Sequence, residues 1–322
     1  MIPIGALDSQ VVSRIGNVSM KTRIGTTGAI FCDRIFWALI VVIVGIDTFW
    51  AWSVGIWFAL DLNTALGFAV LFLINVIYGT VRVSPRIAAL SGALVQLIAF
   101  TVVTGILSYL AVTSDFPLID RYLSAADAAL GFDWLALFKW ISDHPLIRLV
   151  LDLAYLSAAA QIFVLLVLLS IFRMFERMVE FVWLYVLTLL IIIPISWLAP
   201  AAGAWSYYGV AHLTSAYYLP DFFALREGTV REIVMANMVG LIQFPSFHTT
   251  LCFILIYAAR GIRILFPAFL GLNALMVAST FTAGGHYLAD LIGGAAVVPI
   301  AIMIFDWGQR RPAKHGLPAA VC

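Results

Sequence analysis

Two residues in the segment GGHYLADLIGG at 284–294 have the types and spacing needed for nucleophilic chemistry. His286 precedes Asp290 by four positions. On a helix, residues four apart share a face. The carboxylate can then accept a hydrogen bond from one ring nitrogen and raise the basicity of the other. This spacing indicates that His286 is a candidate nucleophile and that Asp290 orients it.

A second histidine begins another hydrophobic run, in the segment QFPSFHTT at 243–250. His248 could reach the same pocket and serve first as a general acid and then as a general base. Ser246 and the first N–H groups of the run would form a helix N-terminus, which favours anions such as phosphate. Two histidines, a carboxylate and an anion cradle suit phosphoryl transfer through a phosphohistidine. That mechanism requires no metal and no other cofactor.

Other interpretations of the same residues stay open. His286 and Asp290 could be only a polar pair that holds two helices together. With His248 they could bind zinc, although such a site needs at least three ligands and the sequence has no H-E-x-x-H pattern. Ser246 is a poor protease nucleophile with His248 as its base, because residues two apart on a helix diverge.

Composition predicts a membrane protein. Of 322 residues, 63% are hydrophobic and 11% are charged, against roughly half and a quarter in soluble domains. The net charge of +1 gives no indication of a nucleic-acid partner. Open strand edges cannot satisfy their backbone groups in lipid. We therefore predict an all-α, polytopic transmembrane bundle.

Hydrophobic runs long enough to cross a bilayer need about 20 residues. Eight candidates occur, the sixth of them short, at 35–60, 63–81, 87–112, 147–172, 179–200, 246–260, 262–282 and 286–306. We expect residues 35–306 to form the catalytic bundle, with its core in the last five or six helices. Residues 1–34 and 307–322 would flank it as an N-terminal segment and a tail.

Two long connections, at 113–146 and 201–245, separate these runs. The first has tryptophans and scattered charges, as in a helix that lies at the interface. The second is rich in tyrosine, which favours the membrane boundary. Eight spans put five of the eighteen Lys and Arg residues on the side of these connections and thirteen on the other. Because positive residues stay in the cytoplasm, both termini are expected there, and the histidine motifs are expected to face outward.

Some polar residues outside the two motifs also need an interpretation. His144 and His212 fall on the expected outer side and suit interfacial positions. Arg148 and Asp152 are four apart, which predicts a structural ion pair. Asp47 lies deep in the first run. Intramembrane acids are functional candidates, but a packing or assembly role for Asp47 is equally open.

The motifs, in order and spacing, resemble the second and third motifs of the type-2 phosphatidic acid phosphatase superfamily. Residues 245–248, PSFH, resemble the P-S-G-H motif. Ser279, His286 and Asp290 resemble S-R-x5-H-x3-D. The sequences of these two motifs are most similar to those of bacterial relatives of inositol-phosphorylceramide synthase, an inositolphosphotransferase. The resemblance implies a six-helix core, His286 as the nucleophile, Asp290 as its orienter and His248 as the general acid and base.

The sequence departs from the family pattern where phosphate-binding cations are expected. Thr280 stands in place of the arginine of the third motif, Phe247 replaces the usual glycine, and the K-x6-R-P motif is absent from any outward position. Phosphoryl transfer needs positive charge nearby. We favour Arg226, in the connection that leads into the run at 246. The further expected phosphate contacts are Ser246, Ser279 and Gly285.

These observations predict a membrane enzyme that cleaves a phosphoester in a phospholipid or lipid phosphate at the outer face. Water as acceptor would make a lipid phosphate or polyprenyl diphosphate phosphatase. A lipid alcohol such as ceramide would make a head-group transferase. A transporter or non-enzymatic scaffold is the alternative, although the polar residues gather at one face instead of the midplane. We expect a bacterial inner membrane, with the site facing the periplasm or the exterior.

Overall fold

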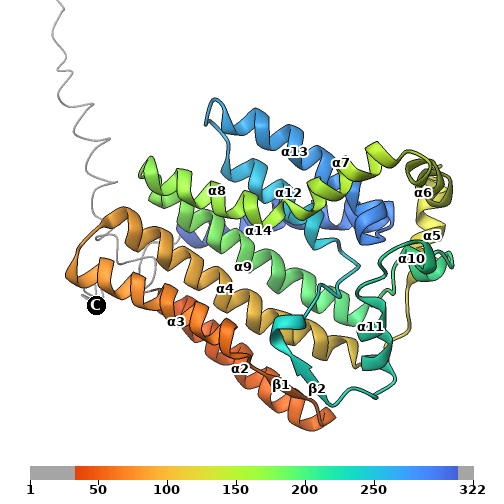
Figure 1. Ribbon diagram of the computed structural model, residues 1–322, viewed down its shortest axis with the longest axis horizontal. Coiled ribbons are helices and arrows are strands. Elements are labelled where there is room, and N and C mark those ends of the chain that lie inside the picture. The colour runs from red at the N-terminus through yellow and green to blue at the C-terminus, as the bar shows by residue number, and fades with distance from the viewer. Residues whose placement is uncertain (1–32, 311–322) are drawn as a thin grey trace, which may run out of the picture.

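Residues 33–310 are described by the computed structural model, and they form a bundle of helices with two three-residue strands. Most of the long helices run between the two ends of the bundle (Figure 1). Both long connections lie at the end where α6, α10 and α11 are labelled. The all-α fold predicted from composition is confirmed. The expected terminal segments fall largely outside the described residues.

Nine helices build the body of the bundle. They are α2 (Arg34–Val54), α3 (Leu62–Val76), α4 (Pro85–Val112), α7 (Pro145–Leu156), α8 (Ala158–Ile171), α9 (Phe175–Leu198), α12 (Phe247–Ala258), α13 (Leu265–Ser279) and α14 (Leu288–Arg310). Short π-helical turns extend α3 and α13, namely η1 (Ile77–Val81) and η4 (Thr280–Gly284).

Shorter elements occupy the connections at one end. The first long connection holds α5 (Asp120–Ala129) and α6 (Trp134–Ser142). The second holds α10 (Ala204–Tyr207), η2 (Ala211–Leu213), α11 (Leu219–Arg226), β2 (Glu232–Val234) and η3 (Met235–Asn237). β2 pairs in parallel with β1 (Trp57–Ala59), which follows α2. This pairing ties the α2–α3 connection to the segment that leads into α12.

Six helices among the described residues are long and apolar enough to cross a membrane unaided. These are α2, α4, α9, α14 and the two helices extended by η1 and η4. The expected fourth span is instead a pair, α7 and α8, bent by 49°. The bend falls at Ser157, whose N–H bonds the Ala154 carbonyl three residues back. The expected sixth span, α12, has only 12 residues.

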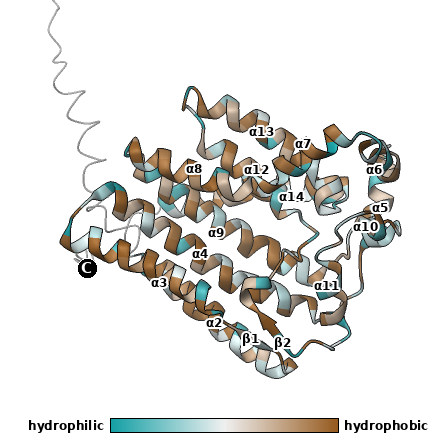
Figure 2. Ribbon diagram, viewed as in Figure 1, coloured by the Kyte–Doolittle hydropathy of each residue, from teal (hydrophilic) through white to brown (hydrophobic). Residues whose placement is uncertain are grey.

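The helices differ in how far they are enclosed by protein. In the hydrophobic stretch of α4, 61% of residues are buried, against 22% in α2 and 6% in the α3 span. The main core lies between α4, α8, α9, α12 and α14, with Phe100, Leu165, Phe181 and Ile254 fully buried. The first two spans are therefore peripheral, and many of their hydrophobic side chains are exposed. The ribbons of α2 and α3 are accordingly coloured mostly as hydrophobic in Figure 2.

A second, more aromatic core packs under the two long connections. Trp134, Trp205, Tyr218 and Tyr287 are each at most 1% exposed there. The Trp205 and Tyr218 rings stack with centroids 5.5 Å apart. The Tyr218 hydroxyl donates to the Ala202 carbonyl, the Tyr287 hydroxyl to Asp120 and the Trp134 indole to the His286 carbonyl. This cluster therefore fixes the connections firmly against the start of α14.

Candidate active site

His286 lies in the short segment between η4 and α14, and its backbone is held on both sides. Its N–H donates to the Thr280 carbonyl at 3.1 Å. Its carbonyl accepts from the Trp134 indole at 2.9 Å. The preceding Gly285 has φ +69°, where a side chain is strained, and a Cβ there would lie 2.8 Å from the Trp205 ring. Glycine at 285 thus permits the turn that presents His286.

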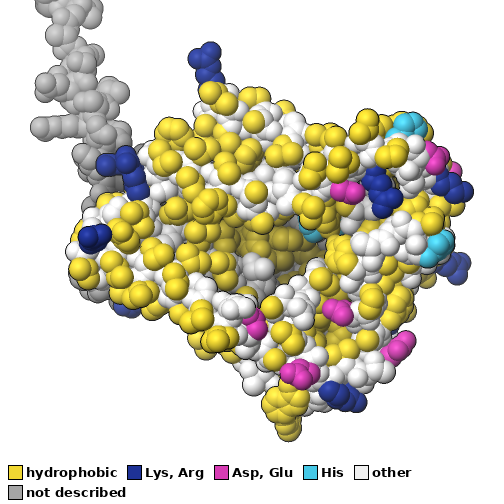
Figure 3. All heavy atoms as spheres, in the orientation of Figure 1, with side chains coloured by type: hydrophobic (Ala, Val, Ile, Leu, Met, Phe, Trp, Pro, Cys, Tyr) yellow, Lys and Arg dark blue, Asp and Glu magenta, His cyan; other side chains and the backbone are white. Residues whose placement is uncertain are grey.

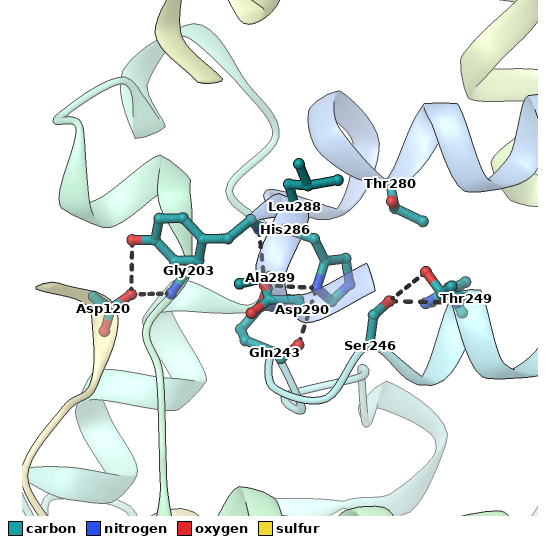
Figure 4. Close-up of polar contacts among 12 residues, drawn as sticks. Asp120, Gly203, Gln243, Ser246, Thr249, Thr280, His286, Leu288, Ala289 and Asp290 are labelled. Atoms are coloured by element: carbon teal, nitrogen blue, oxygen red, sulfur yellow. Dashed lines mark hydrogen bonds and ion pairs between the residues drawn. The ribbon is translucent and has the colours of Figure 1, made fainter. Parts of the chain in front are cut away.

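The ring of His286 is oriented by two acceptors on the same nitrogen. Nδ1 lies 3.1 Å from the Gln243 carbonyl oxygen and 3.3 Å from Asp290 Oδ2. Figure 4 shows both contacts. A carbonyl oxygen can only accept, so Nδ1 carries the proton and Nε2 presents its lone pair. Burial lowers the pKa of His286 to about 4, while the Gln243 hydrogen bond opposes the shift. The ring is therefore neutral near pH 7.

His248 stands on the first turn of α12, facing His286. The two ring centroids are 6.5 Å apart. The His248 ring stacks on Tyr155 of α7 with centroids 4.3 Å apart, and its Nδ1 lies 3.4 Å from the Tyr155 hydroxyl. The structure thus brings His248, His286 and Asp290 together from α12 and the start of α14. Residues 33–310 hold no group of three or more His, Cys, Asp or Glu side chains placed to bind a metal.

Ser246 caps α12 and helps to lock α12 to α14. Its hydroxyl accepts from the Thr249 N–H at 3.3 Å, and its own N–H donates to the Asp290 carbonyl. Thr250 extends this link, since its hydroxyl donates to the Gly294 carbonyl at 2.8 Å. A Cβ on Gly294 would overlap the Ser246 carbonyl oxygen. The close approach of these helices sets the depth of His248 relative to His286.

The other expected phosphate-binding residues are engaged elsewhere. The Ser279 hydroxyl is fully buried and donates to the Met276 carbonyl within α13. The Arg226 guanidinium donates to the Ser114 and Phe116 carbonyls at 3.1 and 2.9 Å. These contacts join Ser279 and Arg226 to neither histidine. Gly285 directly precedes His286, as the spacing requires.

Two acids of α5, which sequence reasoning did not single out, support the site from the first long connection. Asp127 accepts from the Leu288 and Ala289 N–H groups at 2.9 and 2.8 Å, so it caps α14 from a distant part of the chain. Asp120 accepts from the Tyr287 hydroxyl at 3.1 Å. Burial raises the pKa of both carboxyls, and their N–H donors oppose the shift. The connection carries five aspartates, Asp115, Asp120, Asp127, Asp133 and Asp143, and its sequence alone does not distinguish these two from the others.

The polar residues away from the histidine pair lie where an interfacial or structural role predicts. His144 and His212 are exposed on the two long connections. Arg148 and Asp152 form the predicted ion pair at 3.9 Å. That pair is about half exposed, so it contributes little to stability.

Comparison with known proteins places this arrangement in a family. The sequence model of the PAP2 superfamily matches residues 121–304. The match takes in both histidine motifs and the helices from α5 through most of α14. No curated protein and no solved structure matches the chain. The matched residues make up more than half of the sequence, and the chain therefore belongs to the PAP2 superfamily.

Proposed function

We propose that this protein transfers a phosphoryl or phospho-head group from a lipid through a phosphohistidine on His286. Membership of the PAP2 superfamily supports an enzyme of the lipid phosphatase or phosphotransferase type. The observation that carries the finer proposal is the pairing of His286 Nδ1 with Gln243 and Asp290, which leaves Nε2 as the nucleophile.

In the proposed first step, Nε2 of His286 attacks phosphorus and the bond to the leaving oxygen breaks. Asp290 and the Gln243 carbonyl stabilise the Nδ1–H as the ring gains positive charge. His248 donates a proton to the leaving alkoxide. It then removes a proton from water or an alcohol, which attacks phosphorus and frees His286. Rings with centroids 6.5 Å apart can both reach a phosphoryl group lying between them.

We propose that uncharged hydrogen-bond donors bind the phosphate in place of some of the Lys and Arg residues that the family motifs usually supply. The Tyr155 and Tyr217 hydroxyls lie 3.0 Å apart, and Tyr155 stacks on His248. The N-terminus of α12 adds a partial positive charge. Arg226 remains a proposed cation, and it would have to release the Ser114 and Phe116 carbonyls to reach phosphate.

A lipid substrate is supported by the setting of the histidines. Figure 3 shows a hollow in the middle of one face, walled largely by hydrophobic side chains, with a histidine side chain visible inside it. His286 is only 2% exposed. Such a site lets a lipid bring its head group to the histidines while little water enters. This setting favours a lipid alcohol, such as ceramide or diacylglycerol, as acceptor, with hydrolysis by water as the second candidate.

The test is product analysis with purified protein in detergent. The donors are phospholipids, lipid phosphates and a polyprenyl diphosphate, each with and without ceramide or diacylglycerol. A new phospholipid that disappears in His286→Ala would identify a transferase, and free phosphate that disappears would identify a phosphatase. His212→Ala, which changes an exposed histidine on a connection, is the matched control and should keep the wild-type rate.

A covalent intermediate is tested separately with a donor labelled at phosphorus. Rapid alkaline quenching should trap label on wild-type protein, because phosphohistidine survives alkali, and none on His286→Ala. Turnover that persists at the wild-type rate in His286→Ala would overturn the proposal. Since a transporter needs a sealed compartment, turnover in detergent also separates an enzyme from the transporter or scaffold alternative.

A further inference from the structure

A cavity of about 730 Å³ lies between α2, α3 and α4, and neither histidine lines it. These helices precede the region matched by the family model, which begins at residue 121. The lining is apolar except for Asp47, Thr48 and Thr64. The volume falls within the range of ligand sites, which are mostly apolar with a few polar groups.

Asp47 is the unusual member of this lining. It is 5% exposed, and neither of its carboxyl oxygens has a hydrogen-bond partner among the described residues. By contrast, each of the buried acids Asp120 and Asp127 accepts two backbone N–H bonds. The neighbouring Thr48 hydroxyl donates to the Val44 carbonyl and so does not serve Asp47. A buried polar group left in this state is costly.

A carboxyl in this position can accept a hydrogen bond from a donor that enters the cavity. Water is a poor candidate, because a buried water needs two to four polar partners and apolar cavities stay dry. A membrane-facing cavity is instead filled from the bilayer. Its rim carries exposed apolar residues, with Trp52 and Trp57 each 72% exposed.

The depth of Asp47 in the membrane indicates whether the bound donor group is charged or uncharged. Asp47 lies seven residues before Val54, the last residue of α2, which is about 10 Å along the helix. That helix end is joined through β1 and β2 to the connection that leads into α12, and tryptophans mark it as a membrane boundary. A lipid phosphate at this depth would bring a second negative charge into an apolar space beside a carboxyl. An uncharged hydroxyl brings none.

We propose that the α2–α3–α4 cavity binds an uncharged lipid alcohol, whose hydroxyl donates a hydrogen bond to Asp47 and whose acyl chain fills the apolar space. This site is separate from the histidine pair and does not depend on the activity proposed above.

The test is photo-crosslinking of the full-length protein in nanodiscs. The probe is a diacylglycerol with a diazirine in one acyl chain, and the control lipid is its O-methyl ether, which lacks the hydroxyl donor. We expect the diacylglycerol to label peptides of α2, α3 and α4. The ether should label about tenfold less, the effect of one lost hydrogen bond to a buried acceptor.

Three variants separate the role of Asp47 from that of the cavity. Asp47→Leu should reduce labelling by the diacylglycerol to the level of the ether. Thr48→Val lines the same cavity but removes a hydroxyl that already bonds Val44, so its labelling should be unchanged. His286→Ala should also label normally, because the cavity lies apart from the histidines.

Thermal stability in detergent without added lipid supplies an independent readout. Asp47→Leu should raise the Tm, because it removes a buried carboxyl that has no partner. A lower Tm would mean that the carboxyl holds helices together and would overturn the proposal. Equal labelling by alcohol and ether, undiminished labelling of Asp47→Leu, or crosslinking of α2 to a copurified protein chain would also overturn it.

Discussion

At the scale of single residues, the position of one proton on His286 decides whether Nε2 can act as a nucleophile. Both acceptors near Nδ1 favour the tautomer with the proton there. Asp290 also accepts a hydrogen bond from the Tyr287 N–H at 2.8 Å. The same carboxyl therefore contacts the His286 ring and the backbone at the start of α14. The proposed chemistry therefore depends on a carboxylate that never needs to touch the substrate.

Replacing Asp290 with asparagine should remove activity while leaving the fold intact. Oδ2 of Asp290 contacts both His286 Nδ1 and the Tyr287 N–H, so the amide oxygen of asparagine can keep both bonds but carries no negative charge to stabilise the ring as it becomes cationic. We expect kcat to fall by about 10² to 10⁴-fold, with little change in KM. Steady-state kinetics in detergent measures both values. Asp152→Asn, in the exposed pair with Arg148, is the control and should be neutral, whereas an active Asp290→Asn would show that the charge of Asp290 is dispensable.

The contact of His286 with Asp290 was predicted from a four-residue helical spacing, and the two side chains do meet, although His286 lies two residues before α14 begins and not on the helix. The position of His248 followed from two runs starting at the same membrane side. The contacts of Gln243, Asp120 and Asp127 could not be predicted in this way. Asp127 meets Leu288 across 161 residues, and only tertiary packing brings such positions together. Arg226 is the opposite case. Its charge and its place in the sequence predicted a phosphate contact, but in the structure its guanidinium donates to two backbone carbonyls of the first long connection.

At the scale of elements, α14 is capped by a residue from another helix, which makes α5 part of the positioning of His286. Asp127→Ala should lower the free energy of unfolding by about 1–2 kcal/mol, because two N–H groups lose their acceptor. It should also lower kcat by about tenfold with less effect on KM, because the start of α14 loosens and misplaces Asp290.

Asparagine at 127 supplies the control for this capping role. Leu288 and Ala289 bond different oxygens of Asp127, so Asp127→Asn keeps an acceptor for one of the two N–H groups and should restore only part of the stability and activity lost in Asp127→Ala. Thermal unfolding and kinetics on the two variants check the prediction. Equal kcat in wild type and Asp127→Ala would show that the cap is dispensable for positioning the site.

The contact of α14 with α12 rests on a residue without a side chain. Gly294→Ala would place a methyl group against the Ser246 carbonyl and displace the helix that carries His248. We expect a loss of about 1–3 kcal/mol in stability and a clear loss of activity. Gly271→Ala on α13 is the matched control, because a Cβ there meets nothing within 4 Å. If both alanine variants had the same Tm and rate as wild type, the close approach would have no role.

Hydropathy predicted most of the spanning helices but not their shapes. Long apolar runs must be helical in lipid, so α2, α4, α9 and α14 could be predicted from length and composition. The bend between α7 and α8 depends on a local change of hydrogen bonding at Ser157, within a run that is apolar throughout. The parallel pairing of β1 with β2 joins segments that are remote in sequence. Neither feature alters the hydropathy pattern.

At the scale of the whole molecule, the long connections, both histidines and the β1–β2 pair belong to one end of the bundle. The opposite end carries the short connections after η1, α8 and α12, which contain Arg82, Arg173 and Arg260. Since positive residues stay in the cytoplasm, this distribution favours an active site that faces outward. An outward site would act on lipids of the outer leaflet and release its products outside the cytoplasm.

Cysteine labelling in intact cells tests this orientation. In a background with Cys32 and Cys322 changed to serine, Gly228→Cys and Gly261→Cys each place a thiol on an exposed loop with open space around it, although both glycines have positive φ and the change strains each turn. Gly228 follows α11 at the active-site end, and Gly261 lies between α12 and α13 at the other. A membrane-impermeant maleimide should label Gly228→Cys at once and Gly261→Cys only after the cells are opened. The reverse pattern would place the histidines toward the cytoplasm, and immediate labelling of both would mean that α12 does not cross the membrane.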